Sequence, residues 1–255
     1  AAPVICKPIE HGAAVVIHSL TKYIGGHGTA VAGSIVDSGN FDWTADPKRQ
    51  PLFNEPDASY GGAVWGKVVP ELTGANIPFA VRARGCLLRD LGSACSPDNA
   101  FAIIQGLETV ALRMKQHCEN AEKVVSYLKK QSEVTKVIYS TEHDKPIADR
   151  AKQYLKGGNG PMVGIELKGG IDAGKRFIES LKMFYHVANI GDARSLAIHP
   201  ATTTHSQLNE DELAASGVTQ SYVRLCIGIE HIDDIIEDLD QALNKSSKGN
   251  LKAVS

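Results

Sequence analysis

Short apolar runs alternate with glycine-containing loops over the first forty residues of the chain. The stretch AAVVIH (residues 13–18) predicts a buried strand, and GSIVD (33–37) predicts a second strand. This rhythm is typical of a mixed α/β sheet. Residues 40–75 are rich in Pro, Gly, Asn and Asp, so we expect a long ordered excursion with little regular structure there. Loops of this length inside a compact domain tend to be functional.

A helical pattern follows in SPDNAFAIIQGLETVALRMKQHCENAEKVVSYLKKQ (96–131). Its apolar residues recur at steps of three and four, which predicts one long helix with a single apolar face. Ser96 before Pro97 is typical of an N-cap followed by the first helical residue, and Gly106 is a position where the helix can bend. The predicted core face consists of Ile104, Leu107, Val110 or Ala111, Met114, Cys118, Ala121, Val125 and Leu128.

From about residue 131, short strand patterns alternate with helix patterns. The predicted strands are VTKVIY (134–139), PMVGIEL (161–167), SLAIH (195–199) and YVRLCIGI (222–229). The predicted helices are DAGKRFIESLK (172–182), EDELAAS (210–216) and HIDDIIEDLDQALNK (231–245). We therefore expect two domains, residues 1–130 and a small α/β domain at 131–255, joined by the long helix.

The bulk composition excludes several classes of function. A formal charge of −2 and no apolar run of membrane-spanning length predict neither nucleic-acid nor membrane binding. Five scattered cysteines without a C-x-x-C pair favour a reducing cytoplasm over a disulfide framework. No metal site is predicted, since the histidines form no H-E-x-x-H motif.

The stretch HSLTKYIGGHG (18–28) has the most distinctive chemistry. Lys22, taken alone, is best interpreted as a surface amine. Ser19 and Thr21, however, alternate with Leu20, so both hydroxyls can lie on one side of an extended segment. Hydroxyls and glycine amides suit a phosphate group, and a nearby amine can condense with an aldehyde on the same molecule. Pyridoxal 5'-phosphate carries both groups.

HSLTKYIGGHG also resembles the Schiff-base lysine segment of the Cys/Met-metabolism family of pyridoxal-phosphate (PLP) enzymes. The resemblance extends along the whole chain, through LRDLGSACSPDNAFAIIQGLETVALRMKQHCENA, ANIGDARSLAIHPATTTHSQL and VRLCIGIEHIDDIIEDLDQAL. It implies an α/β, PLP-dependent transferase type I fold, with an incomplete large cofactor domain and a small C-terminal domain. It also implies that Lys22 is the catalytic Schiff-base lysine and that Ser19 and Thr21 contact the cofactor phosphate.

The resemblance further implies a set of substrate-binding residues. Arg224, in YVRLCIGIE, matches the family's arginine for the substrate α-carboxylate, and a structural salt bridge is the alternative. Ser195 falls beside the same carboxylate in the family. In the family, the positions of Thr204 and His205 lie near that arginine. The resemblance leaves open whether these residues pack behind it or contact the substrate directly. For Arg194 we hypothesise a contact near the substrate γ-carbon.

Two features favour one activity within the family. They are the long segment from Asn40 to about Ile77 and the sequence NIGDARSLAIHPATTTHSQL. Both resemble the corresponding segments of family members that make L-homocysteine and acetate from O-acetyl-L-homoserine and sulfide, in methionine and cysteine biosynthesis. The alternatives are cystathionine γ-synthase or γ-lyase activity, or a non-catalytic fragment without the N-terminal half of the site.

The resemblance also predicts what must complete the site. The chain corresponds to the family from the middle of the cofactor domain onward. We therefore expect the aspartate at the pyridine nitrogen, the aromatic residue on the ring and a glycine-led phosphate loop to come from a preceding segment. Family members are usually tetramers of paired dimers, so the resemblance predicts a homo-oligomer.

Overall fold

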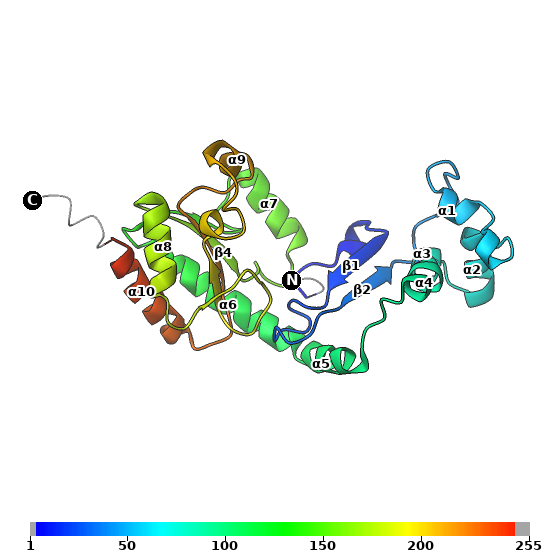
Figure 1. Cartoon of the computed structure of the whole chain (residues 1–255), viewed down its shortest axis with the longest axis horizontal. Coiled ribbons are helices and arrows are strands. Elements are labelled where there is room, and N and C mark those ends of the chain that lie inside the picture. Colours follow the sequence, from blue (N-terminus) through cyan, green and yellow to red (C-terminus); the bar gives the residue numbers. More distant parts are fainter. Residues whose placement is uncertain (1–3, 248–255) are drawn as a thin grey trace, which may run out of the picture. The chain divides into compact units, whose positions relative to one another are not determined.

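The computed structural model describes residues 4–247 of the 255-residue chain, which divide into two compact units (Figure 1). The first unit contains Thr21–Ala30, the described residues before Lys7, and those from Ile103 onward. The second unit contains Lys7–Leu20 and Val31–Ala102. These units group residues by their contacts within the chain. They do not test the predicted domain boundary between residues 130 and 131, which stays a prediction.

A five-stranded mixed sheet forms the centre of the first unit. Its order is β3 (Val134–Ile138), β4 (Met162–Leu167), β7 (Tyr222–Cys226), β6 (Leu196–Ile198) and β5 (Tyr185–His186). The β3–β4, β4–β7 and β6–β7 pairs are antiparallel and the β5–β6 pair is parallel. All four strands predicted in this region are confirmed, whereas the two-residue β5 was too short to give a pattern.

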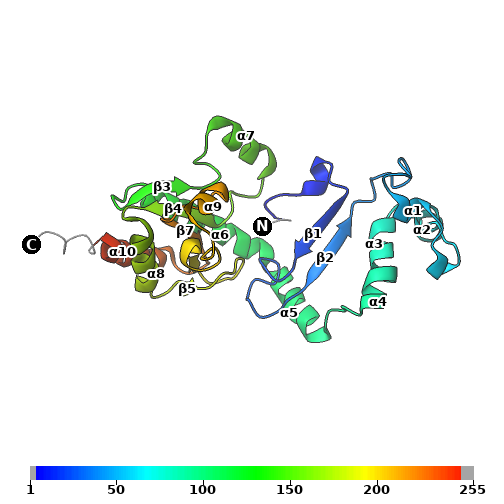
Figure 2. The same cartoon turned by 45° about the horizontal axis from the view of Figure 1, so that its top comes forward.

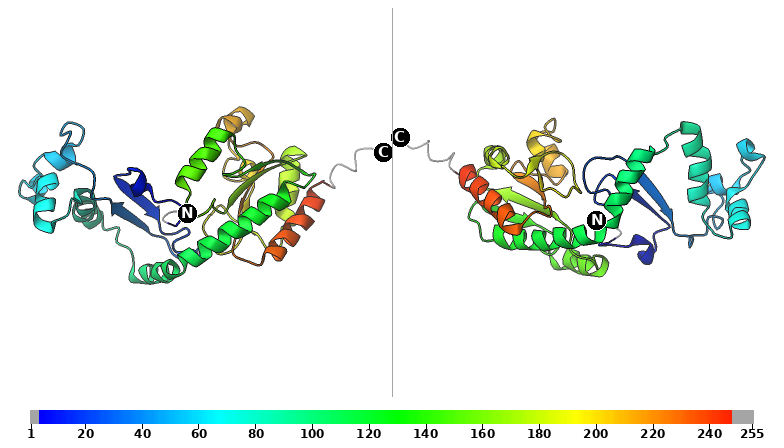
Figure 3. Two further views of the ribbon diagram at one scale, coloured as in Figure 1. Left: turned by 180° about the vertical axis from the view of Figure 1, so that it is seen from behind. Right: turned by 90° about the horizontal axis from the view of Figure 1, so that it is seen from below.

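Three helices pack on this sheet and share one hydrophobic core with it. They are α6 (Val110–Leu128), α8 (Gly170–Ser180) and α10 (Ile232–Ser247), and α6 and α10 run side by side (Figure 3). Val223 and Leu225 of β7 are fully buried in this core. Successive side chains of a strand point to opposite faces, so Arg224 between them lies on the face away from the core. Its register partner on β4 is Gly164.

Two smaller helices complete the first unit. These are α7 (Lys145–Tyr154), which the sequence did not predict, and α9 (Glu210–Ala215), which it did. At the start of α9, Asn209 and Glu212 form a capping box with reciprocal bonds of 3.0 and 2.9 Å.

The helical region predicted over residues 96–131 is confirmed, but it is not one continuous helix, and its interruption lies three residues after Gly106, the position where a bend was expected. The segment forms α5 (Pro97–Glu108) and α6, interrupted at Thr109. The predicted core residues Ile104 and Leu107 are 55% and 49% exposed, whereas the polar His117 and Asn120 are fully buried. The polar side chains are buried because they bind main-chain carbonyls of the segment after β7, which helical periodicity does not reveal.

The second unit contains a two-stranded antiparallel ribbon of β1 (Val15–Ser19) and β2 (Gly33–Asp37) (Figure 2). Both strands were predicted correctly, but the expectation that the first is buried was wrong, since Ile17 is exposed. Within the described chain each strand pairs only with the other, and Ile35 and Val36 of β2 are exposed as well.

The excursion after residue 40 is more regular than expected. It contains α1 (Pro51–Asn54) and α2 (Trp65–Thr73), and then α3 (Pro78–Arg82), a π-helical segment (Ala83–Leu88) and α4 (Arg89–Leu91). Pro70 inside α2 hid this helix from sequence analysis. Trp43, Phe53, Trp65 and Val69 form a separate core for the segment.

Within residues 4–247, every helix is too short or too polar to span a lipid bilayer.

The shared core of the first unit leads to a stability prediction. Leu239→Ala should lower the free energy of unfolding by about 2–5 kcal/mol, because a fully buried leucine leaves a cavity when truncated. Leu112→Ala, the same change at an exposed position of α6, should change it by about 0.5 kcal/mol or less. Urea denaturation followed by circular dichroism measures both, and equal losses would contradict this core assignment.

Candidate functional site

Lys22 and Arg224 come together at a third residue, Asn189. Lys22 Nζ donates a hydrogen bond to Asn189 Oδ1 at 2.5 Å. Arg224 Nη2 donates to the main-chain oxygen of the same residue at 3.2 Å. Both side chains are half-buried. The structure thus brings together the predicted catalytic lysine and the predicted carboxylate-binding arginine, which are 202 positions apart (224 minus 22) in the sequence.

Asn189 was missed by sequence analysis as a site residue. It opens the motif NIGDARSLAIHP, which was used only to compare activities. The asparagine side chain and main chain each supply one acceptor, and this is what orients the two cations. Only the tertiary contact distinguishes it from an ordinary loop asparagine.

The charge at this point is unbalanced. Within residues 4–247, neither Lys22 nor Arg224 forms an ion pair with a carboxylate. Two half-buried cations that share only neutral oxygens as partners favour an anionic ligand.

The segment after Lys22 is held by a buried arginine from α6. Arg113 Nη1 donates to Tyr23 O at 2.8 Å, and its Nη2 donates to Ile24 O at 3.1 Å and Gly106 O at 2.6 Å. Gly26 has φ +74°, and a Cβ placed there would lie 2.0 Å from Arg113 Nη1. The glycine run after the lysine therefore allows this guanidinium to approach the main chain.

Tyr23, the neighbour of Lys22, is also held by its side chain. Its hydroxyl lies 3.2 Å from Cys226 Sγ, and burial raises the pKa of Tyr23 far above its ordinary value, so it stays a neutral phenol. The ring of His117 meets it edge-on at a centroid distance of 5.5 Å. His117 Nδ1 donates to Ile227 O at 2.6 Å, and burial lowers the pKa of His117, which keeps the imidazole neutral.

Arg194 and Ser195 lie in the loop between Asn189 and β6. Arg194 forms an ion pair of 3.1 Å with the buried Asp192 and lies over the ring of Tyr185 at 4.5 Å. Burial by itself would raise the pKa of Asp192, but the hydrogen bonds from Arg194 outweigh it and hold that pKa below its ordinary value. Ser195 is fully buried, and its Oγ donates to Glu230 Oε2 at 2.9 Å.

Three predicted site residues remain. Thr204 is exposed, and its Oγ1 is 2.9 Å from His205 Nδ1. Ser19 ends β1 in the second unit, whereas Thr21 begins the part of the chain that belongs to the first unit. The roles assigned to Ser19, Thr21, Arg194, Ser195 and Thr204 stay predictions.

The donor set fits the cofactor that the sequence resemblance implies. Lys22 is a half-buried primary amine whose only partner in residues 4–247 is a neutral amide oxygen. A guanidinium without a carboxylate partner lies on the other side of the same asparagine. An amine suits an aldehyde, and unpaired cations suit phosphate and carboxylate groups, so these residues fit pyridoxal phosphate with an amino-acid substrate.

Comparisons with known proteins agree with this chemistry. The profile of the family described as "Cys/Met metabolism PLP-dependent enzyme" matches residues 1–244. The O-acetyl-L-homoserine sulfhydrylase of Leptospira meyeri is 48% identical over 246 residues, which cover 94% of this chain and 55% of that protein. The homocysteine synthase of Schizosaccharomyces pombe is 45% identical, covering 94% of this chain and 54% of that protein.

Solved structures show the same relation. A Campylobacter jejuni protein described as an O-acetylhomoserine (thiol)-lyase, crystallised with N'-pyridoxyl-lysine-5'-monophosphate, superposes with a TM-score of 0.84 at 37% identity, covering 95% of this chain and 56% of that one. A cystathionine gamma synthase from Xanthomonas oryzae, in complex with cystathionine, superposes with a TM-score of 0.72 at 29% identity. The match covers 96% of this chain and 54% of that one. The chain spans about half the length of the curated relatives it matches.

The contact between Gly26 and Arg113 can be tested with a matched pair of substitutions. Gly26→Ala and Gly217→Ala both place a side chain at positive φ, +74° and +77°, which costs about 1–2 kcal/mol in each case. Only at Gly26 would the new Cβ also displace Arg113, because Gly217 has nothing within 4 Å. Hydrogen exchange should therefore speed up in residues 22–28 of the first variant alone. Unchanged protection there would contradict the role of Arg113.

Proposed function

This chain belongs to the Cys/Met metabolism family of PLP-dependent enzymes, and on that basis we propose that the protein converts O-acetyl-L-homoserine and sulfide to L-homocysteine and acetate. The observation that carries the proposal is the meeting of the Lys22 amine and the Arg224 guanidinium at Asn189. Relatives named as sulfhydrylases or homocysteine synthases, at 44–48% identity, support this choice of reaction.

Lys22 has two roles in this proposal. Its amine would hold the cofactor through the aldehyde, and the same nitrogen would move protons at the substrate carbons. Bound pyridoxal phosphate supplies an electron-withdrawing ring that stabilises negative charge on those carbons. We assign Ser19 and Thr21 to the phosphate. Asn189 orients the amine through Oδ1, and Arg113 holds the main chain on which the lysine is mounted.

Arg224 is assigned to the substrate α-carboxylate, which its planar guanidinium can bind through two parallel hydrogen bonds. Its contact with the Asn189 carbonyl uses only Nη2, so further N–H donors stay available. We keep Ser195 and Thr204 as predicted contacts near this carboxylate. Arg194 is kept as a predicted contact near the substrate γ-carbon, with Asp192 fixing the direction of its guanidinium.

We also propose that the protein works as a homo-oligomer in the cytoplasm. The support is membership of a family of metabolic enzymes together with the cysteine pattern described above. Cystathionine γ-synthase or γ-lyase activity on the same scaffold is less supported, because the cystathionine gamma synthase among the solved structures is 29% identical, below the sulfhydrylases. An assay of cystathionine and cysteine beside O-acetylhomoserine plus sulfide distinguishes these activities.

The cofactor assignment leads to a labelling prediction. Borohydride reduction of the protein incubated with pyridoxal phosphate should place a pyridoxyl group on Lys22, because this amine is held near a guanidinium that has no carboxylate partner within residues 4–247. Peptide mapping by mass spectrometry locates the label. Lys22→Ala should lose it, together with turnover, whereas Lys115→Ala should keep both, since Lys115 is an exposed lysine paired with Glu119. A label on another lysine would overturn the assignment.

The substrate assignment leads to a kinetic prediction. Arg224→Gln should lower kcat/KM for O-acetylhomoserine by about 10²–10³-fold, because one partner of a charged pair is lost. The KM for sulfide should stay unchanged, since sulfide has no carboxylate. Arg224→Lys should restore part of the loss, and Arg49→Gln, at an exposed position, should have no effect. Equal losses of kcat/KM for both substrates in Arg224→Gln would point to a structural role of Arg224 instead.

A further inference from the structure

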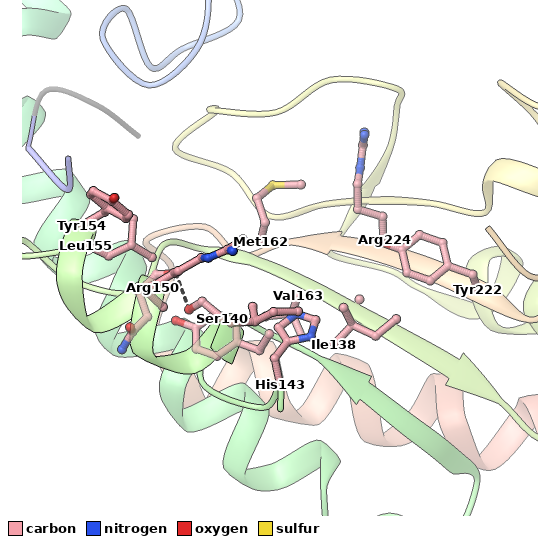
Figure 4. A pocket seen from close by; sticks show the side chains of 15 residues that line it. Ile138, Ser140, His143, Arg150, Tyr154, Leu155, Met162, Val163, Tyr222 and Arg224 are labelled. Atoms are coloured by element: carbon pink, nitrogen blue, oxygen red, sulfur yellow. Dashed lines mark hydrogen bonds between the residues drawn. The ribbon is translucent and has the colours of Figure 1, made fainter. Parts of the chain in front are cut away.

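The first unit contains a cavity of about 540 Å³ beside helix α7 (Figure 4). Strands β3, β4 and β7 contribute one part of its lining, including Met162, Tyr222 and Arg224, and α7 contributes another. The α7 residues on the cavity are Ile147, Arg150, Ala151 and Tyr154, which follow the spacing of one helix face. A cavity of this size is in the range of small-molecule sites, about 300–1,000 Å³.

Helix α7 is amphipathic but buries none of its residues. Ile147 and Tyr154, on its apolar face, are 48% and 38% exposed. Apolar side chains at helical spacing normally pack against a core, whereas here they line a cavity. An apolar ligand in this cavity would remove their surface from water, which is favourable.

The cavity carries positive charge without a compensating carboxylate. Arg150 and Arg224 line it, and no Asp or Glu does. Within residues 4–247, Arg150 has neither a hydrogen bond nor an ion pair, and the one hydrogen bond between lining residues drawn in Figure 4 joins Ser140 and Asn159. A guanidinium with five free donors beside apolar walls favours a ligand with a carboxylate head.

We propose that this cavity binds a small monocarboxylate with an apolar chain, with the carboxylate held by Arg150 and the chain lying against Ile147 and Met162. Lys22 does not line the cavity, so this ligand needs no reactive amine and the proposal does not rest on the function proposed above. Arg224 lines the cavity and also contacts Asn189, so the ligand would lie next to the site of Lys22.

Isothermal titration calorimetry with hexanoate tests the proposal. Hexanoate has the carboxylate and the apolar chain but no amine, so it does not react with pyridoxal phosphate. It should bind the cofactor-loaded protein with one site per chain, and hexan-1-ol, which lacks the charge, should bind at least about tenfold more weakly. Binding heats do not depend on turnover, so the result is separate from any failure of the proposed reaction.

Substitutions on α7 locate the binding. Arg150→Gln should weaken hexanoate binding about tenfold or more, and Arg150→Lys should restore part of it. Lys152→Gln makes a matched charge change on the same helix at a residue outside the cavity lining, and should leave binding unchanged. Ala151→Phe should block binding by filling the cavity without changing its charge. Circular dichroism checks that each variant is folded.

Two results would overturn the proposal. One is the absence of saturable hexanoate binding to the folded wild-type protein. The other is equal binding by wild type, Arg150→Gln and Ala151→Phe, which would place the carboxylate at Arg224 in the substrate site rather than at α7.

Discussion

The structure around the lysine depends on one buried cation that has no carboxylate partner. Arg113 of α6 is almost fully buried, and its guanidinium donates to the main-chain oxygens of Tyr23, Ile24 and Gly106. A buried charge is costly unless its donors are hydrogen-bonded, and carbonyl oxygens satisfy them here. Burial lowers the pKa of Arg113, but an arginine keeps its proton under all ordinary conditions. The segment that carries Lys22 is therefore held by its backbone, and the side chain of Lys22 stays available for chemistry.

The same helix also holds the other half of the site. His117 and Asn120 lie one and two turns beyond Arg113 on α6, and they bind Ile227 O at 2.6 Å, Gly228 O at 3.1 Å and Glu230 O at 2.9 Å. These carbonyls follow β7 directly, and β7 carries Arg224. One rigid element thus sets the positions of both the lysine segment and the arginine strand, which meet at Asn189. Polar residues in the core of α6 are what make this possible.

Positive charge without acidic partners connects the two sites of the first unit. Lys22 and Arg224 share the oxygens of Asn189, and Arg150 lines the neighbouring cavity. Arg194, in contrast, is compensated by Asp192, and the buried Arg113 is satisfied by main-chain oxygens. Lys22 and Arg224 are half-buried, so their partial desolvation is costly in the empty state, and a bound anion relieves that cost. Arg150 is exposed, and its free N–H donors beside the cavity are what favour an anion there.

The sequence by itself determined the strands at 15–19, 33–37, 134–138, 162–167 and 222–226, and it identified Lys22 and Arg224 through their motifs, because local periodicity and motif residues are short-range properties. Only the tertiary structure decided that Asn189 joins these two residues, that Ile104 and Leu107 lie outside the core, and that His117 and Asn120 lie inside it. Helix α7 and its cavity were likewise not predicted from the sequence, because the apolar face of this helix has no partner in the core. These features depend on which distant carbonyls and side chains come within hydrogen-bond distance, and contacts of that range have no counterpart in the order of neighbouring residues.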